Sequence, residues 1–280
     1  MNYIKIITLQ LVLMTNTFYI VVLTFVFLLV SPKMVAQENY QTLVENCYRS
    51  LELQDSISFV EAYPKLWEAY LRENDSYYHI NKELEKRYKL DQSLRLLYMD
   101  SRKKRGNNDD LTRKLRTFID EMDKKNAVYA KSILLKHGWL TTDEISSEAN
   151  EGLFIIVQHC ADTEVQSLCL LLIDKILAEH PEERWHYAFL TDRFAMNQGA
   201  DQIYGTQKII QEGYPYPIPL KYPIKVDSLR ATVGLPPFWT ELNEEYNSDW
   251  SLEKYLLEEK NLRKRYENYI QKNLLNKHIR

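Results

Sequence analysis

The chain has little glycine, with 7 residues in 280, and neither a G-x-G-x-x-G nor a Walker pattern occurs. This scarcity excludes the glycine-rich loops that bind nucleotide phosphates through backbone N–H groups. Cysteine is also scarce, and Cys47, Cys160 and Cys169 show no C-x-x-C pair. An odd number of cysteines without framework spacing excludes a small disulfide-stapled scaffold, although the pairing state of the three remains open.

An excess of positive charge is lacking too, because 36 lysines and arginines face 39 acidic residues and the net charge is -3. Lys5 and Lys33 are the only charges among the first 36 residues, which leaves -5 for the rest of the chain. A net acidic domain without a basic stripe binds nucleic acid poorly, so we expect no nucleic-acid partner.

The N-terminus is almost wholly apolar from Ile6 to Val30, and Ser31-Pro32 then ends the run. Val35-Ala36-Gln37 supplies a weak cleavage signal, but the run is also long enough to span a bilayer uncleaved. The sequence therefore predicts a signal peptide or membrane anchor over residues 1–36. The remainder is expected to be extracytoplasmic (periplasmic or secreted) or anchored to the inner membrane, touching membrane only through this segment.

Apolar residues recur three and four positions apart through the first half, which predicts helices from Tyr40 to about Lys136. A loop is expected at 106–108, followed by a helix capped by Asp109 or Asp110 that ends at Gly138.

Three further helices are expected. The first covers residues 148–160, the second begins at a capping box at 163–166 and ends at about residue 179, and the third covers residues 181–197. Residues 203–222 are rich in β-branched residues, aromatics and prolines, which predicts a short hairpin or extended segment turning at Gly213. A last amphipathic helix is expected over 252–276.

These elements predict a mainly α fold, a multi-helix orthogonal bundle with a short β-hairpin or extended segment near the C-terminal third. The regions expected are an N-terminal helical region over 37–137, a helical core over 138–247 and a C-terminal amphipathic helix over 248–280.

Short strings across residues 90–236 are similar to a known bacterial family, DUF6624, a domain of unknown function. The strings are Asp91-Gln92 with Arg95, Asp123 with Asn126, His137-Gly138-Trp139, Val157-Gln158-His159 with Asp162 and Gln166, Phe189 to Arg193, Gln202 to Gln207, Asp227 with Arg230, and Gly234-Leu235. The resemblance implies a shared mainly helical fold and carries no reaction.

Two polar pairs interrupt apolar helical runs. His159 follows the apolar run 153–157 and is either a general base or a buried histidine whose ring is hydrogen-bonded by neighbours. Asp162, three residues on, either orients it or caps the next helix. Asp192-Arg193 either forms a structural salt bridge, with Asp162 or Asp227 as the partner of Arg193, or grips a carboxylate or phosphate.

The amide and hydroxyl groups nearby are candidate ligand-binding residues, or they tie the hairpin onto the helices. They are Gln158, Gln166, Gln202, Tyr204, Thr206 and Gln207. A metal site would need Asp192, Glu148 or His186 as a third ligand, and no signature such as H-E-x-x-H occurs. We therefore expect no metal and no cofactor.

Two functional classes remain open. The first is a binding or interaction module for an unknown protein or small-molecule ligand. The alternative is a hydrolase-like enzyme with His159 as general base, Asp162 or Asp192 orienting it, and Arg193 holding an anionic group. Convergence of His159, Arg193 and Gln207 on one pocket would favour the enzyme.

Overall fold

The computed structural model describes residues 39–211 and 213–278, with side chains through residue 272. The predicted signal or anchor segment lies outside these residues. The chain divides into two compact units, Met1–Ser76 and Tyr77–Arg280. Within the described part of the chain, no helix combines the length and the apolar character that a membrane span requires.

The first unit is described by two helices that pack together, α2 (Tyr40–Glu52) and α3 (Ser56–Asn74). Each begins at a side-chain cap: Asn39 accepts a hydrogen bond from the backbone N–H of Thr42, and Asp55 accepts one from Ser58. Such caps satisfy backbone donors that a helix start leaves unpaired.

The second unit begins with α4 (Tyr78–Arg105) and α5 (Asp110–His137), which pack together across a turn at Gly106. Asp109 caps α5 by accepting from the backbone N–H groups of Leu111 and Thr112 at 3.0 and 3.3 Å. The helix ends at Gly138. The predicted loop, cap and stop are confirmed.

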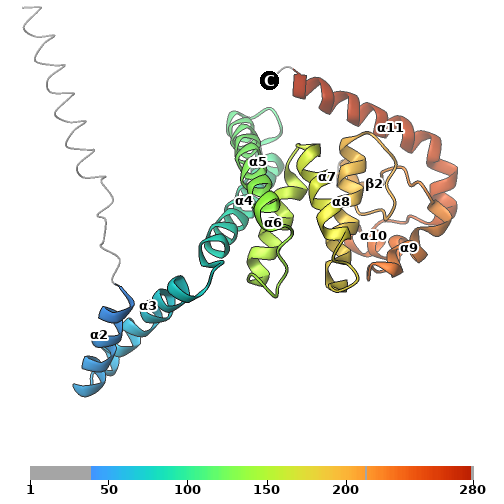
Figure 1. Ribbon diagram of the computed structural model, residues 1–280. Helices are drawn as coiled ribbons and strands as arrows, with labels where there is room; N and C mark the ends of the chain where they lie inside the picture. Colours follow the sequence, from blue (N-terminus) through green and yellow to red (C-terminus); the bar gives the residue numbers. More distant parts are fainter. Residues whose placement is uncertain (1–38, 212, 279–280) are drawn as a thin grey trace, which may run out of the picture. The chain divides into compact units, whose positions relative to one another are not determined.

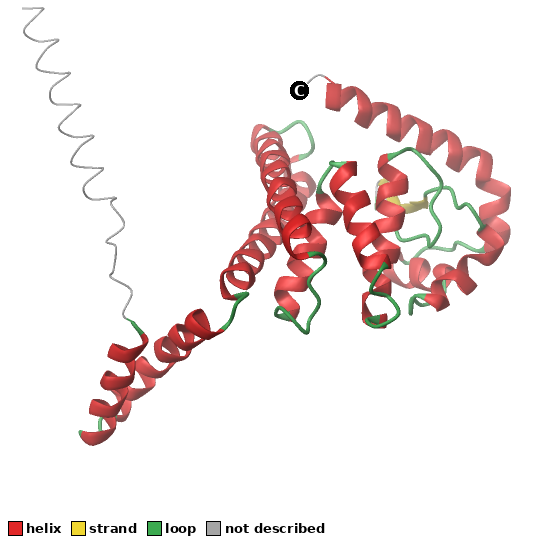
Figure 2. Cartoon of the chain, in the orientation of Figure 1, coloured by secondary structure: helices red, strands yellow, loops and turns green. Residues whose placement is uncertain are grey.

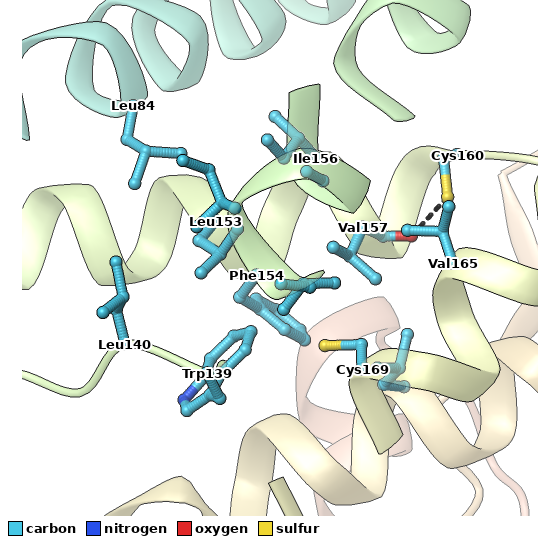
Figure 3. Packing of buried hydrophobic residues seen from close by; sticks show 14 of the residues in the cluster. Leu84, Trp139, Leu140, Leu153, Phe154, Ile156, Val157, Cys160, Val165 and Cys169 are labelled. Atoms are coloured by element: carbon cyan, nitrogen blue, oxygen red, sulfur yellow. Dashed lines mark hydrogen bonds between the residues drawn. The ribbon is translucent and has the colours of Figure 1, made fainter. Parts of the chain in front are cut away.

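The centre of the core is α6 (Ser147–His159), which packs against α4, α5 and α8 (Arg184–Asn197). A Cβ on Gly152 would lie 2.8 Å from the Leu84 carbonyl oxygen, so glycine permits the close approach of α6 to α4. Phe154 and Val157 of α6 meet Cys169 in the main hydrophobic cluster (Figure 3). The helices on both sides of residue 137 therefore share one core.

Helix α7 (Thr163–Asp174) lies beside α8 (Figure 1), and a short 3-10 turn, η1 (Pro181–Glu183), precedes α8. The predicted capping box at 163–166 is wrong, because Asp162 is the residue that caps α7. The helix also ends at Asp174, earlier than expected.

The extended segment forms a two-stranded antiparallel hairpin, β1 (Lys208–Gln211) and β2 (Tyr214–Pro217), which turns at Gly213 (Figure 2). A second 3-10 turn, η2 (Pro223–Lys225), leads into α9 (Val226–Thr232), and α10 (Phe238–Tyr246) follows. These two short helices were not predicted. The last helix, α11 (Leu252–His278), was.

The fold is therefore mainly helical with one small sheet, as the sequence predicts. The C-terminal part has its own hydrophobic clusters, in which Phe238, Trp250 and Tyr255 pack together and Met196 of α8 meets Tyr266 of α11. Helix α8 thus connects the main core to the hairpin and α11.

Candidate functional site

His159 lies at the C-terminal end of α6 and hydrogen-bonds an aspartate that the sequence analysis did not assign to it. Its Nδ1 is 3.0 Å from Oδ2 of Asp91 on α4. The Asp91 side chain is only 3% exposed and the His159 side chain 20%. The ring therefore meets a buried carboxylate on one edge and keeps some contact with solvent.

Asp91 is held by two further side chains. Arg95, one turn along α4, donates from Nε to both Asp91 oxygens at 3.1 and 3.2 Å, and Gln92 donates to Oδ2 at 2.9 Å. Arg95 also reaches Oδ1 of Asp123 on α5 at 2.7 Å. One guanidinium thus lies between two carboxylates, which is the arrangement that makes a largely buried charge tolerable.

A separate hydrogen bond joins α4 to α5 near this network. Arg87 of α4 donates to Asn126 on α5 at 2.8 Å and lies 4.2 Å from the centre of the Tyr129 ring. A hollow lined in part by Asp91, Asp123 and Asn126 opens there, but the side chains as they stand leave it no room for a water molecule. This hollow therefore has no space for a ligand as it stands.

Electrostatics set the protonation of the pair. Burial raises the pKa of Asp91, but the contacts with His159 and Arg95 outweigh it and hold that pKa below its ordinary value. Burial lowers the pKa of His159, and the neighbouring guanidiniums of Arg95 and Arg193 lower it further, against the pull of Asp91. The pair is therefore a carboxylate and a neutral imidazole near pH 7, with the ring proton on Nδ1.

Arg193, on α8, is the second cation acting on His159. Its Nε is buried without a hydrogen-bond partner, and one terminal nitrogen lies 3.8 Å from the sulfur of Met196. Among the described residues no carboxylate pairs with it, so the structural salt bridge to Asp162 or Asp227 is wrong. Burial lowers the pKa of Arg193, the interaction with Tyr269 opposes this, and Arg95 lowers the pKa further. A guanidinium without a counter-ion is suited to an anionic ligand.

The two aspartates expected to orient His159 instead accept hydrogen bonds from backbone N–H groups of other segments. Asp162 is exposed and caps α7, accepting from the N–H groups of Glu164 and Val165 at 2.9 and 3.2 Å. Asp192 is fully buried and accepts from the backbone N–H groups of the loop before β1. The expectation that either orients His159 is therefore wrong, because Asp91 does so.

The polar string before β1 is tied to the fold. The Asp192 carboxylate accepts from the N–H of Ile203 at 2.7 Å and from the N–H and hydroxyl of Thr206 at 2.9 and 3.0 Å. Arg230, only 1% exposed, donates to the Tyr204 carbonyl at 2.9 Å and pairs with Glu241. The backbone of this loop thus lies between a buried anion and a buried cation.

The glutamines predicted as ligand-binding residues differ in how many hydrogen bonds their side chains already make within the protein. Gln202 donates to two carbonyls and accepts from the Gln207 N–H at 2.9 Å. Gln166 donates to the carbonyls of Val157 and Cys160 and accepts from Asn197. Only Gln158 keeps a buried side-chain oxygen without a partner. No contact joins Gln207 to His159 in the described part of the chain.

The other metal-ligand candidates are also separate. His186 is buried and hydrogen-bonds Glu183 at 2.6 Å, with Glu151 on its other side at 3.5 Å, while Glu148 pairs with Lys89. Within residues 39–211 and 213–278 no cluster of three potential ligands has metal-binding geometry. The three cysteines are free and buried.

Sequence reasoning thus identified His159 and Arg193 as candidate site residues and missed Asp91, Arg95 and Asp123 in that role. The missed residues all stood in strings shared with a known family, which was the available signal. The model of DUF6624, a family of unknown function, matches residues 80–248, and the chain belongs to this family. No curated protein and no solved structure matches the chain.

Proposed function

We propose that this chain is an extracytoplasmic binding module, periplasmic, secreted or anchored to the inner membrane, that holds a small anionic ligand beside His159. The observation that carries the proposal is the partly buried guanidinium of Arg193, whose Nε is buried without a partner and which pairs with no described carboxylate. Leaving such a group unpaired costs stability, and an incoming anion offsets that cost. The apolar run Ile6–Val30 supports the location.

NMR titration of the full chain tests this anion binding, with propionate, lactate and inorganic phosphate as probes. We expect at least one of these anions to shift the Arg193 Nε–H and His159 ring signals saturably. Arg193→Met removes the charge and should abolish the effect. Arg184→Met, at an exposed position of the same helix, is the matched control and should not. Saturable binding that survives Arg193→Met, or no binding of any probe, would overturn the proposal.

A second function, hydrolysis, is favoured by one specific contact. Because Asp91 holds the Nδ1 edge of His159, the proton sits there and Nε2 carries the lone pair. Among the described residues Nε2 has no hydrogen-bond partner, and it is not among the buried unpaired atoms, so it meets solvent. A histidine oriented in this way can take a proton from water, and Arg193 would stabilise the developing anion.

Activity against a panel of chromogenic esters and phosphate esters tests this second function. His159→Gln should lower the rate by about 10²-fold or more, because general-base catalysis contributes on that scale. Hydrolysis that is absent, or equal in the variant and the wild type, would rule out the enzyme and leave the binding module standing.

A further inference from the structure

The described part of the first unit exposes many large apolar side chains. Helices α2 and α3 are joined by residues 53–55 and pack together as an antiparallel helical hairpin (Figure 1). Over residues 39–76 the buried apolar side chains are those of Leu43, Cys47 and Ala69. The exposed large apolar side chains of the same stretch are more numerous: Tyr48, Leu51, Leu53, Ile57, Val60, Tyr63, Trp67 and Tyr70.

The exposed side chains of α3 follow a heptad spacing. Successive members are three, four and three positions apart, which places them on one side of the helix: Val60, Tyr63, Trp67 and Tyr70. Each of these four side chains is at least 40% exposed. The buried Ala69 belongs to a different side of α3, the side that packs on α2. The four residues therefore form an apolar stripe that α2 does not cover.

A second stripe on α2 continues the first. Its members are four, four and three positions apart: Tyr40, Val44, Tyr48 and Leu51. The ring of Tyr40 lies 6.1 Å from that of Tyr70, which in turn stacks on Trp67 at 5.4 Å. This contact places both stripes on the same side of the helical hairpin. Together they make one apolar face, called the α2–α3 face.

A helical hairpin of this size needs a partner to bury its apolar surface. Domains below about 40 residues usually depend on a disulfide, a metal or oligomerisation. Cys47 is free, and the described residues hold no group of three potential metal ligands. The exposed fractions of the stripe side chains amount to roughly 600 Å² per copy, on a scale of about 200 Å² for a whole aromatic side chain. Two such faces would bury roughly 1,200 Å², which is the lower end of specific, stable interfaces.

Charge favours a second copy over a lipid surface as the partner. Residues 40–74 carry six acidic and three basic side chains, a net charge of -3. Helices that lie on membranes are instead rich in lysine and arginine, because the lipid surface is negatively charged. The charged side chains of α3 recur four, three and four positions apart on the side opposite its stripe, where they stay clear of a partner on the α2–α3 face: Glu61, Lys65, Glu68 and Arg72.

We propose that the α2–α3 face is a self-association surface, on which two copies of this chain pair about a two-fold axis to form a four-helix bundle. The same apolar face on both copies is what a two-fold interface requires. Tyr63 and Trp67, in the middle of the α3 stripe, are the anchor residues, since aromatic side chains dominate such contacts. The bundle supplies the core that one helical hairpin lacks. The inference concerns other residues than the anion site and does not depend on it.

Thiol crosslinking of the full chain in expressing cells tests the proposal. Tyr63→Cys places a thiol in the middle of the α3 stripe, and a short bismaleimide should join two copies through it. Wild type is the background control, because its three cysteines are buried. Val128→Cys, at an exposed position of α5, is the matched control for random collision. We expect a crosslinked dimer several-fold more abundant from Tyr63→Cys than from either control.

A second substitution shows that the face itself holds the copies together. Val60→Glu, added to Tyr63→Cys, brings two like charges into the interface and should reduce the crosslinked dimer about 10-fold or more. Val128→Glu, the same change on α5, should leave it unchanged. Hydrogen exchange of wild type at two concentrations needs no variant, and dilution should speed exchange in α2 and α3 while α4 to α8 keep their rates.

Three outcomes would overturn the proposal. Equal crosslinking of Tyr63→Cys and Val128→Cys would show random collision. A dimer that Val60→Glu leaves intact would place the contact elsewhere in the chain. Absence of a dimer from Tyr63→Cys would show that the face has another occupant. Protection of its thiol from a water-soluble maleimide only with phosphatidylcholine–phosphatidylglycerol vesicles would then identify a lipid surface, and protection without vesicles another part of the chain.

Discussion

The Nδ1 of His159 and the Oδ2 of Asp91 lie 3.0 Å apart although 68 positions separate them in the sequence. The contact joins α6 to α4, the same helices that approach closely where Gly152 of α6 faces the Leu84 carbonyl of α4. The orientation of the imidazole is therefore fixed by packed helices rather than by a loop. A site on such elements keeps its geometry before a ligand arrives, which reduces the cost of binding.

Replacing Asp192 by asparagine should destabilise the protein by about 3 kcal/mol or more. The buried carboxylate accepts from the N–H groups of Ile203 and Thr206, and an asparagine NH₂ group would face donors instead. Chemical denaturation measures the loss, and amide hydrogen exchange should show faster exchange at these two residues.

Asp162→Asn is the matched control for that substitution. Asp162 is exposed and caps α7, and asparagine caps helices about as well as aspartate, so the change should stay within about 0.5 kcal/mol. Equal losses at the two positions would contradict the role assigned to Asp192 as the anion that fixes the loop.

Gly205→Ala should cost about 2–3 kcal/mol. Gly205 has φ +72°, and an added Cβ would lie 2.8 Å from the Phe238 ring. Gly213 has a similar φ of +82° with nothing within 4 Å of its added Cβ, so Gly213→Ala should cost only about 1 kcal/mol. The difference in unfolding free energy isolates the contact with Phe238, and no difference would mean that the loop yields freely.

A residue of the candidate site could be predicted from the sequence only where it differs in polarity from its neighbours along the chain. His159 and Arg193 stand out because each is a polar residue in an apolar helical run. Asp91 and Arg95 do not, because α4 is charged along much of its length and nothing local distinguishes its one buried aspartate. Only the long-range contact with His159 gives Asp91 its role.

The errors in the fold have a similar origin. Asp162 and Thr163 are adjacent and both suit an N-cap, so spacing alone could not choose between them. Helices α9 and α10 were missed because Pro223 and Pro237 precede them, and prolines close to a short helix resemble an extended segment. Their stability comes from tertiary packing, such as that of Phe238 in the same hydrophobic cluster as Tyr255. No local sequence pattern indicates such contacts.

The pKa values of His159 and His186 should be shifted in opposite directions. Burial and two guanidiniums lower the pKa of His159, so its neutral form supports folding above the unfolded pKa of about 6.5, and that support is lost as pH falls. Burial also works to lower the pKa of His186, but Glu151 and Glu183 outweigh it and raise that pKa. The support from His186 is present below about pH 6.5 and is lost as pH rises through the folded pKa.

Histidine ring NMR titration measures the two pKa values directly. Urea unfolding between about pH 5.5 and about pH 8.5 supplies the linked stabilities. The wild type should lose stability as the pH falls because of His159, and His159→Gln should not show this loss. The wild type should also lose stability as the pH rises because of His186, and His186→Gln should not show that loss. Parallel pH profiles for both variants would contradict the assignment.

The same substitution at the two arginines of the site should have opposite effects on stability. Arg95 lies between Asp91 and Asp123, so Arg95→Met leaves two carboxylates without their cation and should cost about 3–5 kcal/mol. Arg193 has no carboxylate partner among the described residues and one buried unpaired nitrogen. Arg193→Met removes a desolvated charge and should be neutral or stabilising by about 1 kcal/mol.

Urea unfolding of the two variants, without added anions, makes the comparison. The reason for keeping Arg193 at a cost to stability would then be its ligand, so wild type should gain stability from a bound acid and Arg193→Met should not. A large loss in Arg193→Met without ligand would show that the guanidinium supports the fold, and the argument for an anion site at this position would end there.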